Sequence, residues 1–183
     1  MIDREKWWLE AVKFHGHSCP GLAIGVRVSL DFLEDADLTG PAGDEELAAV
    51  AETDACGVDG LQVVTGCTAG KGNLWLRARG KHVFTFYRRN NGWNRRYSWI
   101  GQMDSEVGRE AKTDYFLHGP QAELYRVGPA RQPLPPEASL LPSRPCALCG
   151  EETAEPNLRL DRGRVVCLDC AGEPMDLSRR IRL

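Results

Sequence analysis

The sequence predicts an α+β protein in which helices pack on a mainly antiparallel sheet, followed by a small treble-clef-like zinc finger. Two patterns predict the larger part. Apolar residues recur at helical spacing over residues 3–14 and 20–34, and apolar and polar residues alternate at strand spacing over residues 73–89. A third pattern, two Cys-x-x-Cys pairs near the C-terminus, predicts the finger.

The first two predicted helices flank the stretch FHGHSCPG, residues 14–21. Gly16 stops the first helix, because glycine readily adopts the left-handed backbone that ends a helix. Ser18 is a suitable cap for the second helix, and Pro20 suits its first turn, where a missing N–H does no harm. We therefore expect the second helix to begin near Pro20 and to run to about Glu34.

The elements that follow are shorter. Residues 46–54 fit either a short buried strand or the start of a helix, because periodicity does not distinguish the two in so short a run. Alternation over residues 73–89 predicts a β-hairpin that turns at Gly80 and Lys81. Three further elements are expected: a short helix within 56–67, a helix over 103–117 and a final strand over 122–127.

A change in composition marks the domain boundary. The segment GPARQPLPPEASLLPSRP, residues 128–145, holds six prolines and has almost no periodicity, which is typical of a stiff linker. The sequence therefore predicts a core domain over residues 1–128, a Pro-rich linker over 129–143 and a four-cysteine finger over 144–183.

Composition and charge exclude several classes of protein. The chain has 183 residues, of which 42% are hydrophobic and 27% charged, as in a globular domain. Its net charge of −3 gives no chain-wide attraction for nucleic acid. The N-terminus lacks the apolar run of a signal peptide, and no stretch reaches the ~18–20 apolar residues that cross a bilayer. We expect a cytoplasmic protein without a membrane span.

The seven cysteines favour metal or thiol chemistry over disulfides, since disulfides rarely persist in a reducing compartment. Four of them form the pairs CALC and CLDC, separated by 17 residues: Cys146, Cys149, Cys167 and Cys170. Each pair can reach one zinc ion at about 2.3 Å, and two pairs complete a tetrahedron with no open position. A structural zinc is expected, with a hairpin between the pairs turning at 161–163 and a short helix after Cys170.

The sequence says less about what the finger binds. Residues 143–183 contain seven arginines and seven acidic residues, so their net charge is near zero despite the basic ending SRRIRL. This balance favours protein contact, including contact with a second copy of the chain, and makes nucleic-acid binding the weaker alternative.

The other three cysteines are Cys19, Cys56 and Cys67. Cys19 should lie at or just before the start of the second helix, where free N–H groups stabilise a thiolate, and His17 lies in the same loop. Thiolates with imidazole suit zinc, iron or another transition metal. Buried cysteine often acts only as a small hydrophobe, and His15 fits a hydrogen-bonded turn residue better than a ligand.

The glycine-rich run GCTAGKGN, residues 66–73, does not match a nucleotide-binding P-loop, because its glycines are too close and Lys71 is followed by glycine. A turn of this kind could still hold an anion. Asp54 and Asp59 flank Cys56 and suit either proton transfer or helix capping.

Two of these segments resemble the FmdE family, which is named for formylmethanofuran dehydrogenase. They are FHGHSCPGLAIGVRV, residues 14–28, and CGVDGLQVVTGCTAGKGNLWLRARGKHVFTF, residues 56–86. The resemblance implies an α+β core, often dimeric, with an auxiliary treble-clef zinc finger. It also implies association with molybdenum or tungsten enzymes of one-carbon metabolism.

Carried onto this chain, the first motif implies a metal-binding or catalytic pair, His17 and Cys19. The second motif adds residues that could converge on this pair: Cys56 and Cys67 as further metal ligands, and Asp59, Thr68 and Lys71 as cofactor-binding residues. The chain thus has one implied core site, which could hold a second transition metal, and one structural zinc site.

Three functional hypotheses remain open from the sequence. In the first, the chain is a metal-binding accessory protein or subunit, a homodimer that acts with a molybdo- or tungsto-enzyme. In the second, it is an enzyme with Cys19 as nucleophile or redox thiol and His17 as its base. In the third, it is a non-catalytic scaffold whose finger binds protein or nucleic acid. The number of metals per chain and the reactivity of Cys19 distinguish them.

Overall fold

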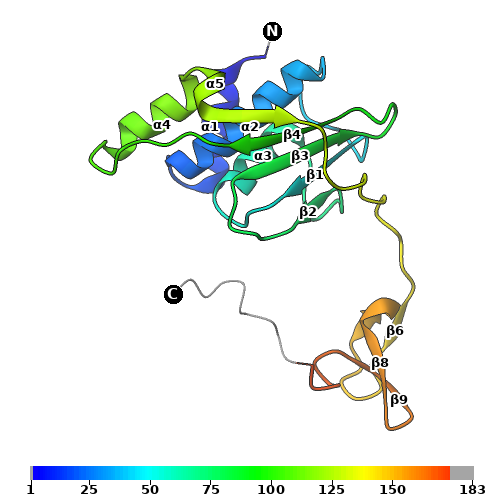
Figure 1. The fold of residues 1–183 in the computed structure, drawn as a ribbon. Helices are drawn as coiled ribbons and strands as arrows, with labels where there is room; N and C mark the ends of the chain where they lie inside the picture. Colours follow the sequence, from blue (N-terminus) through cyan, green and yellow to red (C-terminus); the bar gives the residue numbers. More distant parts are fainter. Residues whose placement is uncertain (1, 174–183) are drawn as a thin grey trace. The chain divides into compact units, whose positions relative to one another are not determined.

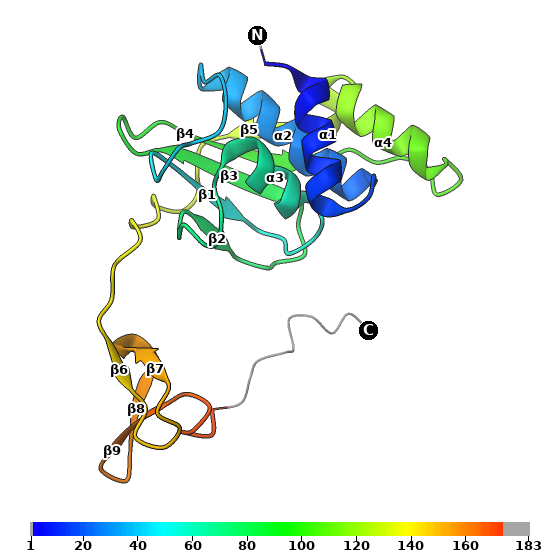
Figure 2. The same cartoon turned by 180° about the vertical axis from the view of Figure 1, so that it is seen from behind.

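Five helices and five strands form residues 2–128, with two helices at the start and three consecutive strands in the middle. The computed structural model describes residues 2–173 and divides the chain into two units, Met1–Ala138 and Ser139–Leu183. Figures 1 and 2 show the larger unit as a layer of helices over one sheet. Its helices are α1 (Arg4–His15), α2 (Pro20–Asp35), α3 (Gly57–Thr65), α4 (Arg109–His118) and α5 (Gln121–Leu124).

The sheet has five strands in the order β2-β1-β3-β4-β5, with one parallel pair, β1 with β2, and three antiparallel pairs. The predicted α+β class with a mainly antiparallel sheet is confirmed. The strands are β1 (Leu47–Ala51), β2 (Leu74–Leu76), β3 (Val83–Arg88), β4 (Asn94–Trp99) and β5 (Tyr125–Gly128).

The predicted hairpin over residues 73–89 is wrong, because β1 lies between its two arms. Val50 pairs with Trp75 on one side and with Thr85 on the other. All five residues of β1 are buried, which suits a central strand, whereas Trp75 and Leu76 of β2 are exposed and suit an edge. The observed hairpin joins β3 to β4 instead.

Three local expectations also differ from the structure. Cys19 rather than Ser18 caps α2, since its sulfur accepts the N–H of Leu22 at 3.3 Å. The helix expected from residue 103 begins only at Arg109, after Gly108. Within 122–127, the chain completes the short helix α5 before β5 begins at Tyr125.

Helix α2 is the centre of the core, with every residue from Leu22 to Leu33 buried. It crosses α3 at backbone distance: a Cβ built on Gly25 would lie 1.9 Å from the carbonyl oxygen of Gly57. Glycine at position 25 therefore allows an approach that any side chain would prevent. This crossing fixes the start of α3 beside the start of α2.

The sheet face away from the helices is partly covered by the Pro-rich segment. The Tyr87 hydroxyl donates to the carbonyl of Gln132 at 3.0 Å, and the Arg89 guanidinium donates to the carbonyls of Pro135 and Pro136 at 2.7 and 3.0 Å. Residues 129–138 thus belong to the core unit by contact, and the observed division falls inside the predicted linker.

The second unit, described to residue 173, consists of two short hairpins. They are formed by β6 (Ser143–Pro145) with β7 (Glu152–Ala154), and by β8 (Leu158–Asp161) with β9 (Arg164–Cys167), with a 3₁₀ turn at Glu155–Asn157. The second hairpin turns at Arg162 and Gly163, both at positive φ, as predicted for 161–163. The expected helix after Cys170 and the basic ending SRRIRL lie mostly or wholly outside the described residues.

Among residues 2–173, no helix is both long enough and apolar enough to cross a membrane.

Candidate metal centres

The stretch FHGHSCPG joins the ends of three helices. His15 is the last residue of α1, Cys19 is the N-cap of α2, and Cys56 is the N-cap of α3. Figure 2 shows these helices next to one another. Arg109 of α4 also reaches the stretch, where its guanidinium donates to the carbonyl of Ser18 at 2.9 Å. The loop is therefore held from four helices.

The shortest polar contact in this group joins His15 to Asp59 of α3. His15 Nδ1 donates to Asp59 Oδ2 at 2.6 Å, and His15 Nε2 lies 3.8 Å from the sulfur of Cys19. The His15 side chain is 11% exposed, and Cys19 is buried. Because Asp59 holds the Nδ1 proton, the lone pair on Nε2 faces the sulfur.

His17 completes a cluster of possible metal ligands. One ligand atom from each of His15, His17 and Cys19 lies within 4.8 Å of the others. The two imidazole rings have centroids 4.5 Å apart, tilted by 40°. In tetrahedral zinc coordination, a nitrogen and a sulfur ligand lie about 3.6 Å apart, close to the observed 3.8 Å. The donor set fits a borderline transition metal such as zinc or iron.

Cys56 borders this cluster. A Cβ built on Gly21 would lie 3.3 Å from the Cβ of Cys56, so the first turn of α2 packs directly on it. Burial raises the pKa of Cys56, and contact with the Cys19 thiol raises it further. Two adjacent thiols oppose each other's ionisation, and a bound cation relieves that opposition.

The structure does not bring Cys67 to the cluster. Cys67 follows the other end of α3, a nine-residue helix, so it lies roughly 14 Å from Cys56 along the helix axis. It is fully buried, and burial raises its pKa to about 11. These features match the small-hydrophobe interpretation of this cysteine.

Thr68 and Lys71 lie at the Cys67 end as well. The Lys71 ammonium donates to the carbonyls of Ala42 and Asp44, both at 3.2 Å, and its backbone N–H donates to the Thr68 hydroxyl. The glycine-rich turn is thereby tied to the loop before β1. Of the second-motif residues implied by the resemblance, only Cys56 and Asp59 converge on His17 and Cys19.

The four C-terminal cysteines form the second cluster. One sulfur from each of Cys146, Cys149, Cys167 and Cys170 lies within 4.8 Å of the others. The sulfurs of Cys149 and Cys167 are 3.9 Å apart, and tetrahedral zinc places two sulfur ligands about 3.8 Å apart. The cluster fits a small zinc finger.

Backbone N–H groups favour the thiolate form of one of these cysteines, Cys146. The N–H groups of Cys149 and Cys167 lower the pKa of Cys146 to about 6, whereas contact with Cys167 raises the pKa of Cys170 to about 12. Four thiols this close cannot all be thiolates without a cation between them. Metal binding is therefore coupled to release of protons.

Comparison with known proteins identifies the family. Residues 14–121 match the family described as "FmdE, Molybdenum formylmethanofuran dehydrogenase operon", which is more than half of the chain. The chain belongs to the FmdE family.

A solved structure shares the FmdE fold seen here. The crystal structure of a tungsten formylmethanofuran dehydrogenase FmdE-like protein from Syntrophus aciditrophicus aligns with a TM-score of 0.64 over 94% of each chain, at 24% identity. A probable S-adenosyl-L-methionine-binding protein of Archaeoglobus fulgidus is 40% identical over 87 residues, which are 45% of this chain. The match covers only 24% of the length of that relative.

The sequence favours a hydrogen-bonded turn residue over a ligand at His15, and the structure shows both a hydrogen bond to Asp59 and a place in the His–Cys cluster. The signal was its spacing: His15 and Cys19 are four residues apart and flank a glycine turn, which returns the end of one helix to the start of the next. Family membership together with both clusters supports a metal-binding FmdE-related protein.

Proposed function

We propose that this FmdE-family protein is a metal-binding accessory protein or subunit of a molybdenum- or tungsten-containing enzyme of the formylmethanofuran dehydrogenase type. The observation that carries the proposal is the convergence of His15, His17 and Cys19 within 4.8 Å at the junction of three helices. The family description suggests the class of partner enzyme.

In this proposal the core metal would be held by the two imidazoles and the Cys19 thiolate, and its fourth position would stay open beside Cys56. The N–H of Leu22 stabilises the thiolate at the start of α2. Asp59 orients His15 and makes its Nε2 a better donor. When bound, the metal would supply Lewis acidity to an oxygen or sulfur of a partner molecule.

The C-terminal cluster would hold a structural zinc in a treble-clef-like finger, with four thiolates and no open position. The finger supports folding and protein contact, either with the partner enzyme or with a second copy of this chain. Light scattering of the purified protein tests the homodimer, which predicts twice the mass of one chain.

Metal analysis of the purified full chain tests the core site. The proposal predicts two metals per chain by elemental mass spectrometry, with one retained in a Cys19→Ala variant. Cys67→Ala is the matched control, since Cys67 is also a buried cysteine of the core, and it should keep both metals. Equal metal content in the wild-type protein and Cys19→Ala would exclude the core site.

A second function is favoured by one observation, the relay from Cys19 through His15 to Asp59. The distances of 3.8 and 2.6 Å resemble those of a nucleophile, its base and an orienting carboxylate. In this alternative, His15 rather than His17 takes the Cys19 proton, and the Asp59 carboxylate stabilises the imidazolium that results.

Thiol reactivity separates the two functions. A catalytic thiol predicts rapid alkylation of Cys19 by iodoacetamide in the protein as purified, and a slower rate in His15→Gln. A metal ligand predicts a protected Cys19 that becomes reactive only after chelation. The match covers only 24% of the relative named for S-adenosyl-L-methionine binding, so it does not support that binding in this chain.

A further inference from the structure

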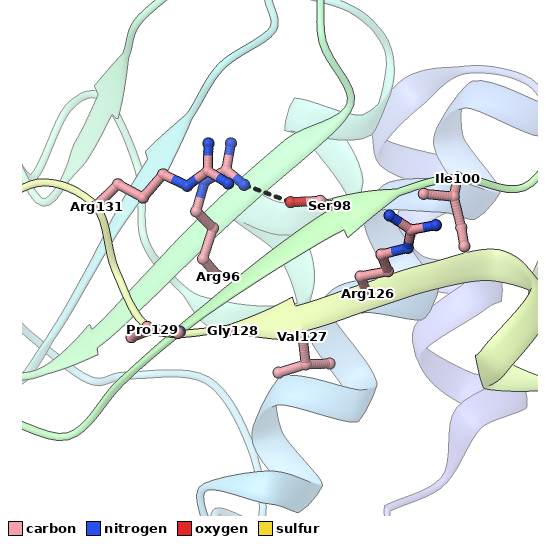
Figure 3. Close-up of a pocket in the computed structure, with 8 residues that line it drawn as sticks. All are labelled: Arg96, Ser98, Ile100, Arg126, Val127, Gly128, Pro129 and Arg131. Atoms are coloured by element: carbon pink, nitrogen blue, oxygen red, sulfur yellow. Dashed lines mark hydrogen bonds between the residues drawn. The ribbon is translucent and has the colours of Figure 1, made fainter.

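An arginine-lined hollow lies on the sheet face away from the helices, over the end of β5 (Figure 3). Its volume is about 410 Å³. Three of its eight lining residues are arginines, and none is acidic. The lining residues are Arg96, Ser98, Ile100, Arg126, Val127, Gly128, Pro129 and Arg131.

The strand register builds this hollow. Tyr97 of β4 is buried on the helix side, where its hydroxyl donates to Asp35 of α2, so its neighbours Arg96 and Ser98 point to the other face. On β5, Gly128 pairs with Arg96, and Arg126 pairs with Ser98. A Cβ built on Gly128 would meet no atom within 4 Å, so the missing side chain leaves the space beside Arg96 open.

The charges in the hollow are only partly balanced. Arg96 is buried and donates to one carboxylate oxygen of Glu52 at 3.2 and 2.8 Å, and also to the Ser98 hydroxyl. In residues 2–173, no side-chain hydrogen bond or ion pair is found for Arg126 or Arg131. Figure 3 shows Arg131 extending toward Arg96. Within the described chain, these two positive charges therefore lack a counter-ion.

We propose that this hollow binds the phosphate group of a small molecule. A phosphate monoester carries nearly two negative charges at neutral pH, which balance the two unpaired guanidinium groups. Arginine forks match phosphate oxygens, and buried Arg96 is held rigidly by Glu52 and Ser98. Ile100, 36% exposed, and Pro129 offer apolar contact to the remainder of the molecule. This site is on the opposite face of the sheet from the His–Cys cluster.

Calorimetric titration of the full chain with phenyl phosphate tests the proposal. We expect saturable binding of one molecule per chain that weakens as salt is added. Arg126→Gln and Arg131→Gln should each weaken it about tenfold or more, the loss expected for a charged hydrogen-bond partner. Arg164→Gln changes net charge equally at an exposed residue of the other unit, and it should leave the affinity within about twofold.

A variant that fills the hollow tests its shape independently of its charge. Gly128→Val fills the open space without altering any charge, and it should weaken binding while the melting temperature stays near that of the wild-type protein. An equal loss of phenyl phosphate affinity in Arg164→Gln and Arg126→Gln would overturn the proposal. So would benzoate binding as tightly as phenyl phosphate. Tighter binding of a DNA duplex that displaces phenyl phosphate would also overturn it, by assigning the surface to a nucleic-acid backbone.

Discussion

Asp59 connects the two motifs at the scale of single residues. It lies in the first turn of α3, and its carboxylate fixes the ring of His15, the last residue of α1. A carboxylate behind a metal-binding imidazole sets the tautomer and raises the basicity of the other nitrogen. Asp59 is therefore expected to support metal binding although it is not itself a ligand.

Replacing this carboxylate should weaken metal binding without removing a ligand. Asp59→Asn is expected to lower the metal affinity of the proposed core site by roughly 10–100-fold, because the amide cannot stabilise the Nδ1 proton as well. Competition with a coloured chelator measures this. Glu10→Gln, on the exposed side of α1, removes the same charge and should have no effect; equal weakening in both variants would indicate a general charge effect.

Cys67 gives a prediction in alkaline solution. Burial raises its pKa from 9.0 to about 11 in the folded chain, so folding favours the protonated thiol. Its contribution to stability is complete below pH 9 and is lost as the pH rises to about 11. The loss amounts to roughly 2–3 kcal/mol in the free energy of unfolding.

Urea unfolding at about pH 8.5 and about pH 11 measures this loss. Other thiols and tyrosines titrate in the same range, so the comparison is made with Cys67→Ala, which should lose less stability than the wild-type protein over that interval. Parallel losses in the two proteins would show that Cys67 ionises as readily as an exposed thiol.

At the scale of elements, the site depends on how closely α2 and α3 cross. Gly25 and Gly57 meet through their backbones, and Gly60 lies against Val26 in the same way, with a built Cβ 2.7 Å from its nitrogen. This contact sets the start of α3, with Cys56 and Asp59, beside Cys19. Glycine inside a helix normally costs about 1 kcal/mol, and the close packing offsets that cost here.

Gly25→Ala should therefore be severely destabilising. Its methyl group would overlap the Gly57 carbonyl, and separating the helices should lower the free energy of unfolding by about 3 kcal/mol or more. Gly40→Ala is the control, since a Cβ there meets nothing within 4 Å, and it should change stability by about 0.5 kcal/mol at most. Denaturant titration of both variants measures the difference.

Elements are predictable where local pattern determines them. The helices at Arg4–His15 and Pro20–Asp35 follow from apolar spacing and a glycine stop, and the finger hairpin follows from its turn residues. The hairpin predicted at 73–89 is wrong because strand pairing is not local. Alternation identifies β3, but nothing near it shows that the small apolar run Leu47–Ala51 inserts beside it.

The candidate site is predictable to a similar extent. The cysteine spacing of the finger identifies all four members of its cluster, because pairs three residues apart are held by a local turn. For the core, His17 and Cys19 stand out as one motif, and Cys56 and Asp59 join them through the crossing of α2 and α3. The sequence also groups Cys67 with these residues, because it does not show which end of α3 lies next to His17 and Cys19.

At the scale of the whole molecule, the two units differ in how they are stabilised. The core unit contains a large buried cluster centred on α2, whereas the finger buries only Cys146, Val166 and Cys167 within its described residues. So small an apolar interior cannot offset the entropy of folding without a metal or another cross-link. The finger should therefore need a metal in order to fold, whereas the core should fold without one.

Chelation of the full chain should unfold the finger while the core stays folded. Trypsin is then expected to cut after Arg159, Arg162 and Arg164, which lie on the β8–β9 hairpin, because an unfolded segment becomes accessible to protease. Cys149→Ser should give the same fragments without chelator, and Cys67→Ala should not. Mass spectrometry of the digest identifies each cut, and a finger that remains protected after complete metal removal would contradict the dependence on metal.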